Sequence, residues 1–174
     1  METFKAFAMR RSSRGFKPDQ IPDEALEKIL DAGCVAPVGR GDYDSLHLAV
    51  VQNSEIIDKI SDTAKKAMGR DGGPGIYYGA PTIVIVSAKE SPAPGLDIAN
   101  AACVADHMLV AAADLSIGSI FIWATAAAVN ANPELAALAG IPEGYKPQAT
   151  VALGYPEQEV TERAFERKIA ISKV

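Results

Sequence analysis

The chain has 174 residues, of which 48% are hydrophobic and 22% are charged, and this composition predicts one water-soluble globular domain over residues 1–174. Its net charge of −5 argues against a nucleic-acid surface, because such a surface needs a clustered basic excess. Neither a secretory signal nor a membrane span is expected, since Glu2 and Lys5 interrupt the N-terminus and charged residues interrupt the apolar stretch 99–122. We therefore expect a cytoplasmic protein.

Apolar periodicity and β-branched runs predict helices that alternate with strands. In chain order these are a helix over Met1–Met9, a helix from Ile21 to Ala36, an interior strand over Leu46–Val51, a helix capped by Ser54 and ending near Met68, a strand over Thr82–Val86, a helix from Asp97 to about Leu115, a strand over Ser119–Trp123, a short helix with Pro133 in its first turn, and a strand over Gln148–Leu153. Four glycines within Gly69–Gly75 predict a flexible loop. The order indicates an α/β or α+β domain, with one sheet covered by helices.

The helix predicted from Asp97 to Leu115 is apolar or small on nearly every face. Such a helix must be buried all round, which a chain of this size does with difficulty on its own. We infer a subunit interface on one side of it, and the alternative is a central core helix in a monomer.

Side chains that could bind a metal are few, and no metal site is expected. Cys34 and Cys103 are far apart and lie in apolar surroundings, so they are interpreted as buried free thiols in a reducing compartment. Asp106 and His107 could form a metal or acid/base element, but a buried polar pair at an interface is favoured because no second ligand set is present.

Five consecutive residues, Arg10 to Arg14, carry three guanidinium groups and two hydroxyl groups. Each guanidinium offers a planar pair of donors that matches the oxygens of a phosphate, and serine hydroxyls can complete the cradle. A solvated basic patch is the alternative. The sequence contains no glycine-rich nucleotide motif, no nucleophile elbow and no zinc-protease motif. Phosphate binding without protein-borne reactivity points to a cofactor that brings its own chemistry. Trp123 is expected in the core or in a pocket wall.

Four segments, in order along nearly the whole chain, share the pattern of one family. They are Met9–Phe16 with an Arg-Arg-Ser-x-Arg-x-Phe opening, Ile21–Pro37 with a long helix and an Ala-Pro end, Tyr78–Val86 followed by the helix that ends at Leu115–Ser119, and Gly140–Gly144 leading to Val151–Pro156. Together they resemble the FMN-dependent nitroreductase family in its short form.

The resemblance implies an α+β fold with a central, mainly antiparallel sheet flanked by helices, in an intertwined homodimer with FMN at each of two interfaces. It implies that Arg10, Arg11 and Ser12 hold the phosphate and ribityl oxygens, helped by Arg167 and Lys168. It places Arg14 at the pyrimidine edge, as an electrostatic tuner of the reduced ring. The remaining implied FMN contacts are Pro37, Val38, Gly39 and Gly41, supplied by the partner subunit, and Ile122, Trp123 and Ala124 beside flavin N5.

The loop after Pro37 departs from the family pattern, which reads Ala-Pro-Ser-x-x-Asn-x-Gln-Pro-Trp. Gly41 stands where the family has Asn, and Tyr43-Asp44-Ser45 replaces Gln-Pro-Trp. Arg40 or a backbone group is expected to replace the missing side-chain contact with the flavin. Ala124 stands where the family often has Gly.

The resemblance implies an FMN-dependent NAD(P)H oxidoreductase. Hydride would pass by a ping-pong cycle through flavin N5 to a nitroaromatic, a quinone or another small acceptor, with no protein acid or base required. The alternative is a non-catalytic flavin-binding protein, either a carrier or a sensor, and a weaker one is an anion-binding regulatory domain.

Overall fold

The sheet is built around β2 (Thr82–Ala88), all seven residues of which are buried in the computed structural model, which describes residues 2–70 and 72–174. β2 pairs antiparallel with β1 (Leu46–Val51) and with β4 (Lys146–Gly154), and β4 pairs antiparallel with β3 (Gly118–Ile122). The strand order is β1-β2-β4-β3, which confirms a central antiparallel sheet. The prediction that β1 is an interior strand was wrong. β1 lies at an edge, where its apolar residues are only partly covered and Val50 is 39% exposed.

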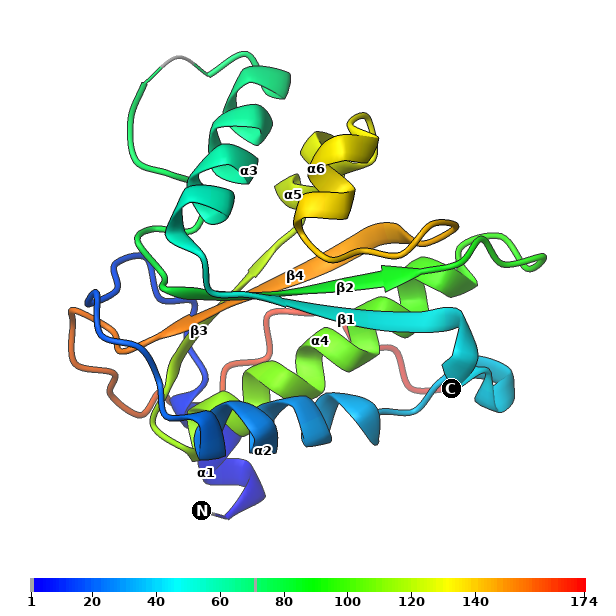
Figure 1. Cartoon of the computed structure of the whole chain (residues 1–174). Coiled ribbons are helices and arrows are strands. Elements are labelled where there is room, and N and C mark those ends of the chain that lie inside the picture. Colours follow the sequence, from blue (N-terminus) through cyan, green and yellow to red (C-terminus); the bar gives the residue numbers. More distant parts are fainter. Residues whose placement is uncertain (1, 71) are drawn as a thin grey trace.

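Helices cover both faces of the sheet, as Figure 1 shows. On one face α2 (Asp23–Cys34) and α4 (Leu96–Asp114) pack against Val84, Val86 and Leu153. On the other face α3 (Ser54–Ala67), α5 (Ala124–Val129) and α6 (Pro133–Leu138) pack against the alternate side chains, which include Ile83 and Ile85. The alternation along β2 therefore feeds two apolar cores, which confirms the predicted sheet covered by helices.

The ends of the helices follow their capping residues. Asn53, and not Ser54 as predicted, caps α3, because its side-chain oxygen accepts the N–H of Ile56 at 3.2 Å. Asn132 caps α6 in the same way. The first helix, α1 (Thr3–Met9), begins later than predicted, because Glu2 precedes it as the N-cap and Met1 lies outside the described residues. Asp71, in the predicted flexible loop, also lies outside them. Two 3₁₀ turns, η1 (Gly39–Gly41) and η2 (Tyr43–Ser45), link α2 to β1.

The helix α4 is buried on one side only. Ile98 is 51% exposed, and Ala99, Ala102 and Asp106 are exposed at spacings of three or four residues, so they share the open side. Asp106 and His107 are therefore not buried within this chain alone, and their burial at a subunit interface stays a prediction. His107 is half-buried and its Nδ1 lies 3.1 Å from the Cys103 carbonyl oxygen.

Among the described residues, α4 is also the one helix long and apolar enough to cross a membrane, by length and composition alone. Because α4 packs on α2, α1 and β4, it is a core helix of this domain. The prediction of two buried thiols was wrong as well, because Cys34 is exposed and Cys103 is half-buried. The apolar residues next to Cys34 and Cys103 in the sequence do not determine which side of α2 or α4 is covered by the rest of the protein.

The C-terminal tail leaves the sheet after β4 and runs in extended form to Val174. Residues 161–174 are all exposed, among them Phe165 (65%) and Ile169 (84%). The tail touches α1, because Arg163 N–H donates to the Ala8 carbonyl at 3.2 Å and the Phe165 ring packs edge-on against Phe4. A segment with so much exposed apolar surface buries little of itself within its own chain.

Candidate functional site

The backbone of the basic loop, Arg10–Gly15, is fixed on two sides. On one side Ser12 bridges to Ser119 of β3, and Ser13 N–H donates to the Ser119 carbonyl at 3.0 Å. On the other side Gly15 accepts the N–H of Glu157 at 3.0 Å. The loop therefore extends the sheet at its β3 edge, and its backbone is held in place there.

Two glycines allow the chain to pack this closely around the loop. A Cβ atom at Gly154 would lie 2.8 Å from Pro81 Cδ and 3.0 Å from Phe16 Cδ1. At Gly118 it would lie 3.0 Å from both Ser13 Oγ and the Gly154 carbonyl oxygen. Phe16, which ends the loop, is 5% exposed. Tight packing thus fixes the loop from behind, and such packing leaves little room to shift.

The arginine side chains themselves are nearly free. Within the described part of the chain, the guanidinium groups of Arg10 and Arg14 make no hydrogen bond or ion pair, and Arg11 Nη2 makes one long contact, 3.4 Å from the Thr161 carbonyl oxygen. A cavity of about 340 Å³ is lined by 11–15 on one side and by 156–158 and Val160 on the other. Unpaired guanidiniums beside serine hydroxyls are the donor set that a phosphate ester takes up.

The C-terminal cations come back to the same loop. Arg11, Arg167 and Lys168 line one hollow of about 770 Å³, although 156 positions separate Arg11 from Arg167 in the chain. Lys168 also pairs with Glu166 at 3.2 Å, where both side chains are exposed. The structure therefore brings the tail to the basic loop. Arg10 has a different position, since it ends α1 and lines none of the cavities described here.

The residues predicted beside flavin N5 lie at the far end of β3. Ile122 is buried, Trp123 is 66% exposed, and Ala124 begins α5. Of the two positions predicted for Trp123, the core is excluded by its exposure after the end of the strand at Ile122, and a pocket wall stays a prediction. Phe121 is 40% exposed on the same strand. Beyond Ser119, this edge of the sheet offers open apolar surface next to the basic loop.

The remaining predicted contacts, Pro37–Gly41, are not near the basic loop in this chain. The basic loop precedes one end of α2 and Pro37 follows the other, and a helix of 12 residues is about 18 Å long. Figure 1 shows the two loops at opposite ends of the molecule. One chain therefore carries two separated halves of the predicted site.

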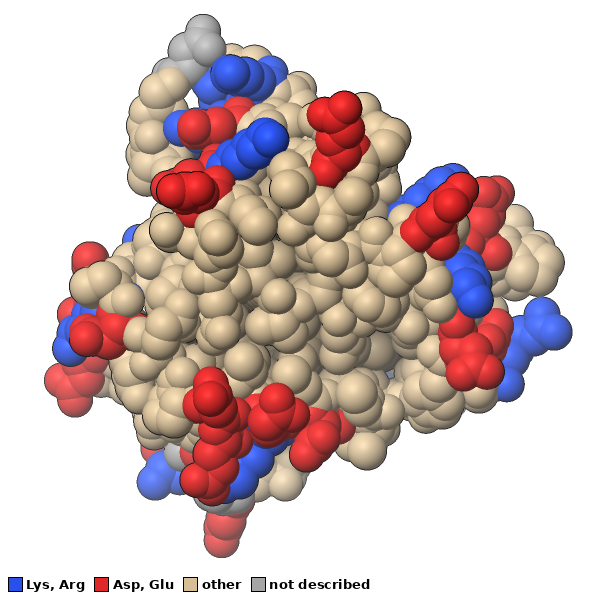
Figure 2. Space-filling model, viewed as in Figure 1, with Lys and Arg blue, Asp and Glu red and all other residues tan. Residues whose placement is uncertain are grey.

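Charges on the molecular surface do not form a second basic site in the view of Figure 2. On that face, lysines and arginines sit at the margin among acidic side chains, and the centre is uncharged. Glu24 and Glu27 of α2 are both exposed. Glu24 pairs with Lys28 at 2.7 Å, and this contact holds the pKa of the Glu24 carboxyl below its usual range.

Two parts of the site were not foreseen from sequence. The segment Pro156–Gln158 lines the basic cavity, and no pattern in the sequence indicates that it lies there. Asn100 accepts the N–H of Gly39 in the loop after Pro37, and its signal was visible: it is the single Asn within the largely apolar α4. A lone amide in an apolar helix usually has a buried hydrogen-bond partner.

The family model described as the nitroreductase family matches residues 7–155 of this chain. The chain belongs to the nitroreductase family. A protein of Methanothermobacter thermautotrophicus is 30% identical over 162 residues, which cover 91% of this chain and 79% of that protein, and it carries the provisional name NADH dehydrogenase/NAD(P)H nitroreductase. A protein of Archaeoglobus fulgidus with the same provisional name is also 30% identical, over 91% of this chain and 87% of its own length.

Solved nitroreductases share the fold. A Bacteroides fragilis nitroreductase crystallised with bound FMN is 29% identical, with a TM-score of 0.85 over 99% of this chain and 100% of that one. A Desulfitobacterium hafniense nitroreductase with bound FMN is 25% identical, with a TM-score of 0.86 over the same shares. The nitroreductase fold predicted from sequence is confirmed by both.

Proposed function

We propose that this nitroreductase is an FMN-dependent NAD(P)H oxidoreductase that passes electrons to a nitroaromatic, a quinone or another small acceptor. The observation that carries the proposal is the basic loop: a family member presents the unpaired guanidinium of Arg14, the weakly held guanidinium of Arg11 and serine hydroxyls at a cavity, beside an open sheet edge. The related proteins crystallised with FMN support the cofactor, and the provisional names of the archaeal relatives support NAD(P)H. A cytoplasmic location is part of the same proposal.

The residues present fit an FMN phosphate. Arg10, Arg11 and Ser12 are assigned to the phosphate and ribityl oxygens, together with Arg167 and Lys168 from the tail. Of these residues, Arg11, Arg167 and Lys168 line one hollow. Arg14 is assigned to the pyrimidine edge, where a fixed cation stabilises negative charge that develops during reaction. When bound, FMN supplies the two-electron chemistry itself. The protein's part is to bind, orient and set the charge around the ring.

We propose a homodimer, because the two halves of the site lie at opposite ends of one chain. In a dimer, Pro37–Gly41 of one subunit would reach the basic loop of the other. The open side of α4 and the exposed apolar residues of the tail supply the surface for such an interface. Exposed apolar patches of this kind mark interaction sites.

A non-catalytic carrier or sensor is the second candidate. It is favoured by one feature, the loss of the usual Asn and Gln-Pro-Trp residues at Gly41 and Tyr43–Ser45. The family relatives named as NAD(P)H nitroreductases favour the enzyme.

The test is the visible absorption spectrum of the purified protein, before and after NADH or NADPH. We expect a yellow protein that bleaches with a nucleotide and is re-oxidised by a nitroaromatic or a quinone. A yellow protein unaffected by both nucleotides would support the carrier. A colourless protein that takes up no added FMN would overturn the flavin proposal altogether.

A further inference from the structure

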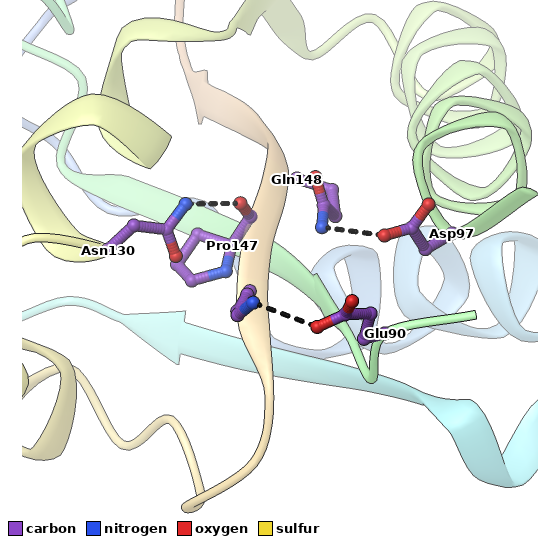
Figure 3. A network of polar contacts seen from close by, with 6 residues as sticks. Glu90, Asp97, Asn130, Pro147 and Gln148 are labelled. Carbon is purple, nitrogen blue, oxygen red and sulfur yellow. Dashed lines mark hydrogen bonds and ion pairs between the residues drawn. The ribbon is translucent and has the colours of Figure 1, made fainter. Parts of the chain in front are cut away.

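A polar cleft of about 340 Å³ separates the loop Gly39–Ser45 from the segment Lys89–Asn100. Its wall on the α4 side is braced from β4, as Figure 3 shows. Lys146 pairs with Glu90 at 3.2 Å, and Gln148 Nε2 donates to Asp97 Oδ2 at 3.3 Å. Both contacts join this wall to β4, and neither of them reaches the loop across the cleft.

One buried side chain of α4 crosses this cleft. Asn100 is 5% exposed, and its Oδ1 accepts the backbone N–H of Gly39 at 2.9 Å. Leu96, one turn earlier, lies so close that a Cβ at Gly39 would be 2.6 Å from its Cδ1. The loop therefore packs directly on α4 at Gly39, and the hydrogen bond from the Gly39 N–H to the buried Asn100 side chain fixes its distance from the helix.

The loop beyond Gly39 adopts an unusual path. Arg40 has φ of 66° and Gly41 has φ of 65°, so two consecutive residues are left-handed. Such a conformation is unfavourable for Arg and persists where the surrounding structure determines it. On the far side, Tyr145 Oη donates to the Asp44 carbonyl at 2.9 Å, and Lys89 N–H donates to the Ser45 carbonyl at 2.8 Å. Asn100 is the anchor nearest the left-handed pair.

We propose that Asn100 is the positioning residue of the ring-facing loop: through the Gly39 N–H it fixes Val38–Gly41 where the loop meets the flavin of the partner subunit. The inference rests on the proposed function and on the dimer. It explains how this chain manages without the family's usual Asn at position 41: the loop is ordered from behind by α4, so that its backbone keeps its place. Preorganisation of this kind raises affinity by lowering the ordering cost of binding.

The test compares Asn100→Leu, Asn100→Asp and Gln148→Leu in the full-length protein, with FMN as the probe. Leu is close to Asn in size but leaves the half-buried Gly39 N–H without its acceptor, and the loss of this hydrogen bond corresponds to about tenfold weaker FMN binding. Asp keeps an acceptor oxygen for the Gly39 N–H but buries a charge, so this variant should bind FMN more tightly than Asn100→Leu and less tightly than the wild type. Gln148→Leu in β4 removes the polar contact to Asp97, which lies one turn before Asn100 in α4. This variant should change FMN affinity by less than about twofold.

Hydrogen exchange at the Gly39 amide gives a second readout that needs no flavin. We expect the amide to be protected in the wild type and in Asn100→Asp, and to exchange at least about tenfold faster in Asn100→Leu. Wild-type FMN affinity in Asn100→Leu, or an equal loss in Gln148→Leu, would overturn the inference. If the wild type takes up no FMN, the proposed function fails; unchanged Gly39 protection in Asn100→Leu would then overturn the anchoring by itself.

Discussion

The basic loop, Arg10–Gly15, and the loop Val38–Ser45 are held in contrasting ways. In the basic loop the backbone is fixed by strand-like hydrogen bonds and close packing, while Arg10 and Arg14 have no polar partner within the described residues. In the second loop it is side chains that hold the chain: Asn100 and Tyr145 each bond to its backbone. The first arrangement leaves charged groups available to a ligand. The second leaves a shaped backbone surface.

The contrast teaches where the two ends of a cofactor would be recognised. A phosphate is bound by charge, so free guanidiniums on a rigid backbone suit it. A planar ring is bound by contact area and a few directed hydrogen bonds, so a fixed backbone suits it. The two loops are separated by the length of α2, so this division of roles operates across a subunit interface or not at all.

Breaking the interface should therefore have the largest effect. Ala102→Glu places a carboxylate on the open side of α4 and, in a dimer, buries it without a partner. We expect the dimer dissociation constant to rise by more than about 100-fold, because an unpaired buried charge costs several kcal/mol. Analytical ultracentrifugation measures the change, and FMN uptake should fall with it. Ala137→Glu, at an exposed position of α6, is the matched control. A dimer that survives Ala102→Glu would contradict the interface proposed on α4.

Removing charge from the basic loop should have the next largest effect. Arg11→Ala deletes the guanidinium that lines both the basic cavity and the hollow with Arg167. Charge-assisted hydrogen bonds are worth about 1.5–3 kcal/mol each, so FMN should bind about 100-fold more weakly. Fluorescence quenching of FMN measures the affinity, and its dependence on salt should weaken in the variant. Arg70→Ala, outside every described cavity, should bind as the wild type does. Equal losses in both variants would show that general charge is responsible.

The packing behind each loop gives a third comparison, this time in stability. Gly154→Ala sets a methyl group against the Pro81 ring and Phe16, neither of which can move freely, so the free energy of unfolding should fall by about 2 kcal/mol. Gly39→Ala meets the end of the Leu96 side chain, which can rotate away, so its loss should be less than about 1 kcal/mol. Urea unfolding at constant pH measures both. A larger loss at Gly39 than at Gly154 would mean that the second loop, and not the first, is the more tightly packed.

Sequence patterns predicted the parts of this structure that local chemistry determines. The β-branched run at Thr82–Val86 could only be a buried strand, and the apolar helix through Met108 could only lie against the sheet. The basic loop was found because three arginines in five residues are conspicuous in an acidic chain. These features can be predicted without knowing which other parts of the chain surround them.

The errors concern what surrounds an element. An apolar run such as Leu46–Val51 has the same sequence pattern in an edge strand and in a central strand of a sheet. The edge position of β1 is therefore known only from the strand order in the structure. The helix α5 is six residues of mostly alanine, too short for periodicity to reveal. The exposure of Cys34 and Trp123 depends on which side of a helix or turn is covered. Asn100 was overlooked because its partner is the backbone of a loop 61 positions away.

The smallest expected effect concerns pH at the fixed end of the second loop. His47, in β1, touches Tyr145, which anchors that loop, and its Nδ1 is buried with no hydrogen-bond partner among the described residues. Burial lowers the pKa of His47 below its ordinary value of 6.5. The neutral imidazole is therefore favoured in the folded state, while the unfolded chain takes up a proton near pH 6.5. Stability should be fully present above that pH and should decline as the pH falls through 6.5 and then through the lower pKa of the folded state. Urea unfolding between pH 8 and about pH 5 measures the decline. His47→Gln should flatten the dependence of stability on pH in this range, and His107→Gln should leave it unchanged. If His107→Gln flattens it instead, His107 is responsible for the effect, and the proposed link between β1 and the loop is wrong.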